Sequence, residues 1–110
     1  MLKTLPPTAE DVSDLVLRLR RVVEPTKIYL FGSFARGDFG PESDLDILVV
    51  VPDGVDLMSA NKEAYRQLRG CGLDVDVLYV NASHFMRHAG TPGYVFQEVL
   101  RDGREIYAAA

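Results

Sequence analysis

Apolar residues recur along this chain at two spacings, one typical of helices and one typical of strands. After Thr8, apolar side chains repeat every three or four residues as far as Pro25, which predicts an amphipathic helix with a capping-box-like start at Thr8 and Asp11. Apolar runs bounded by glycine, proline or aspartate predict buried strands. The later predicted elements are a strand at Lys27–Phe31, a helical turn at Phe34–Arg36, a strand at Asp44–Val51, a helix at Leu57–Leu68, a strand at Leu73–Val80, a helix at Ser83–His88, a helix from Val95 to Gly103 and an edge strand at Glu105–Tyr107.

The order of these elements defines the expected fold class. Helices and strands alternate along most of the chain, which predicts a mixed α/β (α+β) domain with helices packed on a small mixed sheet. The 110 residues suffice for one modest core, so we expect residues 1–110 to form a single domain. Hydrophobic residues at 47% and charged residues at 25% are typical of a folded globular chain, so we do not expect a disordered one.

Two pairs of aspartates stand at the starts of two predicted strands, Asp44 with Asp46 and Asp74 with Asp76. Residues i and i+2 of a strand share a face and lie about 6.6 Å apart, so each pair directs two carboxylates the same way. If the two strands are neighbours, the acids gather at corresponding ends, where repulsion and apolar neighbours disfavour their ionised forms. A hard cation such as Mg²⁺ or Mn²⁺, bound by carboxylates and substrate phosphates together, would compensate. The alternative is that the aspartates are solvated and unrelated, but the repeated pattern favours a shared site.

A glycine–serine turn precedes the first acidic pair. Gly32 and Ser33 follow a predicted strand and enter a short helical turn, and such turns present backbone N–H groups to anions. Gly32 would let a phosphate approach the backbone, and the Ser33 hydroxyl adds a donor. Arg36 could reach the same phosphate or pair with Asp38, and the sequence leaves both readings open.

Net charge and cysteine content limit the expected binding partners and the cellular compartment. The net charge of −4 gives no overall attraction to nucleic acid, and we do not expect direct nucleic-acid binding. Five arginines could form a local basic face, although the solvated sides of two amphipathic helices are the favoured reading: Arg18, Arg20, Arg21, Arg66 and Arg69. Cys71 is the only cysteine, which excludes an intrachain disulfide and fits a reducing compartment. With no apolar run long enough for a signal core or a membrane span, we expect a cytoplasmic protein and no membrane contact.

Two further patterns are only weak indications of a functional site. His84 and His88 have the i, i+4 spacing of a zinc pair, but no additional ligand is evident nearby in the sequence. The five tyrosines are scattered among apolar positions, which favours core or sheet positions over a platform for stacking bases.

Four segments of the chain resemble the minimal nucleotidyltransferases of the DNA polymerase beta superfamily. The segments are residues 30–37 (LFGSFARG), 43–49 (SDLDILV), 75–78 (VDVL) and 97–107 (QEVLRDGREIY). The resemblance implies a polymerase-beta-like fold and a complete catalytic set. It implies that nucleotide phosphates contact Gly32 and Ser33, and that two Mg²⁺ or Mn²⁺ ions are held by Asp44, Asp46 and Asp76. We include Arg36 and Ser43 as further candidate phosphate contacts, with the alternative pairing of Arg36 still open. Asp74 has no counterpart in the pattern and is most simply an acid at the rim.

The expected activity is a Mg²⁺-dependent transfer of a nucleoside monophosphate, AMP from ATP in the first instance, to a hydroxyl group, with release of pyrophosphate. By resemblance, the acceptor is a small helical HEPN toxin, and this chain is the antitoxin of a HEPN/MNT toxin–antitoxin pair. Both a hetero-oligomer and a homodimer are compatible with the sequence. Two rivals remain: an antitoxin that acts by binding alone, and a transferase that modifies a small molecule such as an aminoglycoside.

Overall fold

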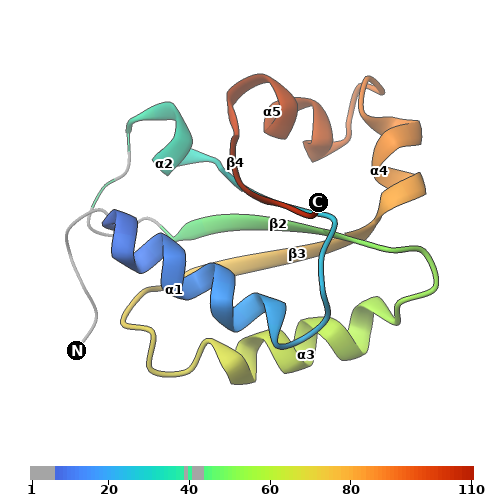
Figure 1. The fold of residues 1–110 in the computed structure, drawn as a ribbon. Coiled ribbons are helices and arrows are strands. Elements are labelled where there is room, and N and C mark those ends of the chain that lie inside the picture. Colours follow the sequence, from blue (N-terminus) through green and yellow to red (C-terminus); the bar gives the residue numbers. More distant parts are fainter. Residues whose placement is uncertain (1–6, 39, 41–43) are drawn as a thin grey trace.

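A four-stranded mixed sheet forms the centre of the molecule (Figure 1). The computed structural model describes residues 7–38, 40 and 44–110. The strands are β1 (Lys27–Phe31), β2 (Leu45–Val51), β3 (Val75–Asn81) and β4 (Arg104–Ala108), and their order in the sheet is β3-β2-β1-β4. Strand β1 is antiparallel to β2 and β4, whereas β2 and β3 are parallel. The predicted fold class, including the edge position of the last strand, is confirmed.

Helices cover both faces of this sheet. The helices are α1 (Ala9–Arg20), α2 (Ser33–Arg36), α3 (Leu57–Gln67), α4 (Ala82–His88) and α5 (Val95–Asp102). Figure 1 shows α1 and α3 on one side of the sheet and α4 and α5 on the other, with α2 beyond the end of β1. In the described part of the chain, no helix has the length and apolarity that a bilayer crossing requires.

The apolar side chains of β2 point alternately to the two faces of the sheet, which explains why helices pack on both faces. Leu45, Ile47, Val49 and Val51 are buried in the core with the residues of α1 and α3. Leu48 and Val50 point the other way, into a second core with Phe85 of α4 and Phe96 of α5. By the same period of two, Asp46 belongs to the face of this second core. The strand is thus buried along its length except near its start, where the acids lie.

The ends of the first helix follow from its sequence. Thr8 Oγ1 accepts a hydrogen bond from the Asp11 backbone N–H (3.1 Å), and Asp11 Oδ2 accepts one from the Thr8 N–H (2.8 Å), which confirms the predicted capping box. At the other end, the Arg18 guanidinium donates to the carbonyl oxygens of Gln67 and Arg69, both at 2.9 Å. Arg18 therefore joins α1 to the end of α3 rather than standing on a free basic face.

The two strands that carry the acids begin slightly later than the sequence predicts. Strand β2 starts at Leu45 rather than Asp44, and β3 runs from Val75 to Asn81 rather than from Leu73 to Val80. Asp44 and Asp74 therefore immediately precede their strands. The ladder nevertheless reaches this far, because the Leu45 N–H donates to the Asp74 carbonyl oxygen at 2.9 Å.

Candidate active site

The predicted site residues that the structure describes meet at one end of the sheet, which we call the acidic edge. Because β2 and β3 are parallel, both begin at this edge, and β1 ends there because it runs antiparallel to β2. In the sheet register, Asp46 pairs with Asp76 on one side and with Phe31, the residue before the glycine–serine turn, on the other. Three segments far apart in sequence thus converge at Asp46, as the aspartate pattern predicts.

Asp46 lies in a partly buried and electrically crowded position. Desolvation raises the pKa of its carboxyl group, and the negative charges of Asp76, Asp44 and Glu98 raise the pKa further. The positive charge of Arg36 opposes them. The ionised carboxylate is therefore poorly compensated by the protein alone, which is the electrostatic setting that a bound cation relieves.

Gly32 brings the turn directly against this carboxylate. Its backbone has φ +74° and ψ −150°, a conformation that only glycine adopts readily. A Cβ atom at this position would collide with Asp46 Oδ2 and lie 3.0 Å from Asp46 Cγ. Glycine is therefore required both for the turn and for the space beside Asp46, and Ser33 begins α2 immediately afterwards.

Arg36 lies between two acids at the edge of the site. Its guanidinium is 3.6 Å from Asp38 Oδ2 and 3.6 Å from Glu98 Oε2. The predicted pairing with Asp38 is thus present, and the ion pair with Glu98 also ties α2 to α5. The side chain remains exposed, where ion pairs are weak enough to exchange for a phosphate. The other predicted phosphate contact, Ser43, lies outside the described residues.

Tyr65 is a neighbour of the site that the sequence did not single out. Its hydroxyl accepts a hydrogen bond from the Val77 N–H (3.1 Å) and lies 3.5 Å from Asp76 Oδ1, toward which it donates. One turn earlier on α3, Asn61 Nδ2 donates to the Val77 carbonyl oxygen at 3.0 Å. The two side chains satisfy the outer edge of β3. Their i, i+4 spacing on the helix that connects the two acidic strands is the sequence signal that could have indicated them.

The donor chemistry at this edge fits a divalent cation bound jointly with phosphate. Within residues 7–38, 40 and 44–110, no three histidine, cysteine, aspartate or glutamate side chains form an assembled metal cage. However, Asp44, Asp46 and Asp76 offer hard oxygen atoms, and ions such as Mg²⁺ usually combine one or two carboxylates with substrate phosphates. Desolvation and the charges of Asp76, Asp44 and Glu98 raise the pKa of Asp46, so a cation bound at this carboxylate would favour its ionised form.

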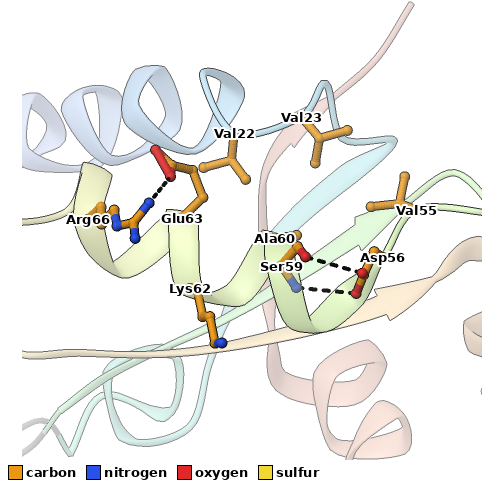
Figure 2. A pocket seen from close by; sticks show the side chains of 9 residues that line it. All are labelled: Val22, Val23, Val55, Asp56, Ser59, Ala60, Lys62, Glu63 and Arg66. Carbon is orange, nitrogen blue, oxygen red and sulfur yellow. Dashed lines mark hydrogen bonds and ion pairs between the residues drawn. The ribbon is translucent and has the colours of Figure 1, made fainter.

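A hollow lies on the other side of the sheet, between the end of α1 and α3 (Figure 2). Its volume is about 490 Å³. Four of the polar side chains drawn there bind one another: Asp56 accepts from Ser59 at the start of α3, and Arg66 pairs with Glu63 at 3.3 Å. These contacts stabilise α3, and they lie away from the acidic edge.

The fold, the acidic edge and the glycine–serine turn define a nucleotidyltransferase. Residues 12–102 match the nucleotidyltransferase domain family, so the chain belongs to that family. It is a minimal nucleotidyltransferase, which confirms the class that the motifs indicate.

Solved structures similar to this chain come from toxin–antitoxin complexes. A chain in the crystal structure of a toxin–antitoxin complex with AMP-PNP is 26% identical, with a TM-score of 0.67, and the match covers 89% of this chain and 73% of that one. A complex of tri-AMPylated Shewanella oneidensis HEPN toxin with MNT antitoxin contains a chain that is 24% identical, with a TM-score of 0.62 and coverage of 91% and 71%. At that identity the second likeness concerns the fold alone.

A short stretch is also similar to a curated protein of Methanocaldococcus jannaschii named "Putative protein adenylyltransferase MJ0604". The two are 71% identical over 24 residues, which is 22% of this chain and 24% of that protein. The match therefore spans about a quarter of that relative, and what its name says applies to that protein.

Proposed function

We propose that this chain transfers AMP from ATP to a hydroxyl group of a partner protein, as the antitoxin of a HEPN/MNT toxin–antitoxin pair. The observation that carries the proposal is the convergence at Asp46, whose carboxylate lies against the Gly32 turn and in register with Asp76. A turn suited to phosphate and a group of acids suited to metal thus share one edge of the sheet. Nucleotidyl transfer requires both on the same triphosphate, the metal ions at the α phosphate and the turn at the phosphates that leave.

Each residue has a defined task in this proposal. Asp44, Asp46 and Asp76 would hold two divalent cations, whose bound charge would neutralise the α phosphate and favour in-line attack upon it. The Gly32–Ser33 turn binds the β and γ phosphates, and Arg36 exchanges an acidic partner for a phosphate oxygen. Asp76 accepts the proton of the attacking hydroxyl. The hydroxyl oxygen then bonds to the α phosphorus, the bond from that phosphorus to the bridging oxygen breaks, and pyrophosphate leaves.

The relatives support the choice of nucleotide and acceptor. One similar chain was crystallised in a complex with AMP-PNP, an ATP analogue, and another in a complex whose HEPN toxin carries AMP groups. We therefore propose ATP as donor and a HEPN-type helical protein as acceptor. Added AMP would place negative charge and bulk on the toxin, where either can exclude an RNA phosphate.

Labelled ATP tests the reaction type directly. The purified chain is incubated with a HEPN-type partner, Mg²⁺ and ATP radiolabelled at either the α or the γ phosphorus. Nucleotidyl transfer places the α label on the partner and releases the γ label as pyrophosphate. A partner labelled only from the γ position would instead indicate a kinase, and a partner labelled from neither position would remove the proposal. Asp46→Asn is the matched variant, and it should label nothing.

A further inference from the structure

An apolar hollow lies along the outer side of the edge strand β3, and its lining includes Leu78 and Val80 from the face of the sheet that carries the acids. Its volume is about 560 Å³, and it is lined by residues of β3, α4 and the start of α5 together with one residue of α3, among them Leu57, Leu78, Val80, His84, Tyr94 and Phe96. Cavities of this size that combine apolar and aromatic walls with a few polar groups are typical of small-molecule sites.

Two different elements connect this hollow with the acids. Along β3, Leu78 is the next residue after Asp76 on the same face, about 6.6 Å further on. Along α5, Val95 precedes Glu98 by three residues, so the two lie on one side of the helix. Val95 lines the hollow, and Glu98 contributes to the charge around Asp46. The hollow thus lies beside the site.

The exposure of Leu78 is unusual for its place in the sheet. On this face of β2 and β3 its register partner Leu48 is fully buried, and Val80, the next residue inward, is 4% exposed. Leu78 is 43% exposed. Its apolar surface is therefore available to a ligand directly beside Asp76, the last of the acids along β3.

Aromatic side chains form the wall above this apolar floor. Tyr94 is 38% exposed and stacks on His88 at a centroid distance of 4.3 Å, and the His84 ring meets Tyr94 at 5.8 Å and Phe96 at 5.7 Å. These ring contacts pack the side chains of the wall against one another, and they give the spacing of His84 and His88 a role in an aromatic cluster. The imidazole of His84 also brings hydrogen-bonding nitrogen atoms to the hollow. Tyr94 thus lies at a ligand-sized hollow rather than in the core, unlike the core or sheet position that the sequence favoured.

We propose that this hollow holds the base and ribose of the nucleotide, with Leu78 as the floor and Tyr94 and His84 on the wall. The inference rests on the proposed function, because it assumes that the phosphates lie at the Gly32 turn and the acidic edge. A nucleoside attached to an α phosphate at that edge extends over the neighbouring surface, and the hollow supplies an apolar surface of suitable size there.

Inorganic tripolyphosphate separates this hollow from the phosphate site, because it has the phosphates of ATP and lacks the nucleoside. Calorimetry with Mg²⁺ should show that Leu78→Ala weakens ATP binding about three- to tenfold, as expected for lost contact with a half-buried apolar side chain. Binding of tripolyphosphate should not change. Met86→Ala is the matched control, because Met86 is an exposed apolar residue of the neighbouring α4 that does not line this hollow. It should change neither affinity.

The possible outcomes separate the two proposals. If Leu78→Ala leaves ATP affinity unchanged, or weakens ATP and tripolyphosphate equally, the nucleoside lies elsewhere even though the transferase proposal stands. The same conclusion follows if the substitution weakens only the binding of a protein partner. If the wild-type chain binds neither ligand, both proposals are wrong. Photolabelling of the wild-type chain with an azido-substituted ATP is an independent test, in which the labelled peptides are identified. The label should fall on the peptides that contain Leu78 or Tyr94, and a label confined to other peptides would overturn the assignment.

Discussion

Neutralising Asp46 should stabilise the metal-free protein while removing its activity. Because burial and neighbouring acids raise the pKa of Asp46 above its ordinary value of 3.8, folding favours the protonated form. The stabilising contribution of this group is therefore fully present below that ordinary value and is lost as the pH rises through the raised pKa. At neutral pH the ionised carboxylate is destabilising, and Asp46→Asn removes that charge.

The size of the effect follows from the sheet geometry. Asp46 and Asp76 are register partners on adjacent strands, which lie about 4.8 Å apart. At that separation two unit charges repel by about 1 kcal/mol in water and about 3 kcal/mol at an effective dielectric constant of 20. Because both side chains reach solvent, we expect a gain near the lower figure. For a domain of this size, about 1 kcal/mol corresponds to a rise in Tm of roughly 4–8 °C.

Thermal unfolding in EDTA, followed by circular dichroism from acid to neutral pH, measures this gain. The advantage of Asp46→Asn should be largest at neutral pH and should disappear as the pH falls below the ordinary carboxyl pKa. Added Mg²⁺ with ATP should raise the Tm of the wild type and leave that of the variant nearly unchanged. Asp56→Ala is the opposite control, because hydrogen bonds from Ser59 and Met58 lower the pKa of Asp56, so its loss should lower the Tm at neutral pH. A large drop in the Tm of Asp46→Asn in EDTA would refute the electrostatic account.

Three further predictions concern the surroundings of the site and the core. Gly32→Ala should abolish transfer and lower stability by about 1–3 kcal/mol, because the new methyl group collides with Asp46 and the backbone conformation is strained; wild-type transfer rates in this variant would contradict the packing. Tyr65→Phe should lower kcat about tenfold with little change in the KM for ATP, as expected for a residue that orients a catalytic ligand. Asn61→Ala should leave kcat unchanged. Equal losses of kcat in both variants would mean that the two side chains act only by holding the edge of β3. Tyr79→Phe should stabilise the fold by about 1 kcal/mol in chemical denaturation, since this buried hydroxyl has no hydrogen-bond partner among the described residues and desolvation raises its pKa to about 12; a loss of stability would reveal a partner.

The sequence predicts the elements of this fold well because its local signals agree with one another. The capping box at Thr8, the apolar run of β2 and the glycines after α3 each define an element boundary without reference to the rest of the chain. The convergence of the acids also follows from sequence, since the repeated Asp-x-Asp pattern places them at corresponding ends of two strands. The starts of β2 and β3 were predicted one and two residues early, because the boundary depends on pairing between strands and not on apolar character.

What the sequence does not predict depends on contacts between distant elements. The bond between Tyr65 and Asp76 requires α3 to pack beside the edge strand, and the pair of Arg36 with Glu98 requires α5 to reach α2. The exposure of Leu78 also depends on such contacts, because α4 and α5 cover Val80 but do not reach Leu78, two residues earlier on the same face of β3. The spacing of apolar residues along the chain therefore does not reveal which of these side chains contact each other or stay exposed.

The mass of a co-expressed partner tests the central claim most directly. A HEPN-type toxin is produced with the wild-type chain or with Asp76→Asn, and the intact mass and RNA-cleaving activity of the toxin are then measured. The account predicts that the wild type adds one or more AMP units and silences the toxin, and that the variant does neither although it still folds. A toxin that stays unmodified and is silenced equally by both forms would show that the chain acts by binding alone, which would contradict the account.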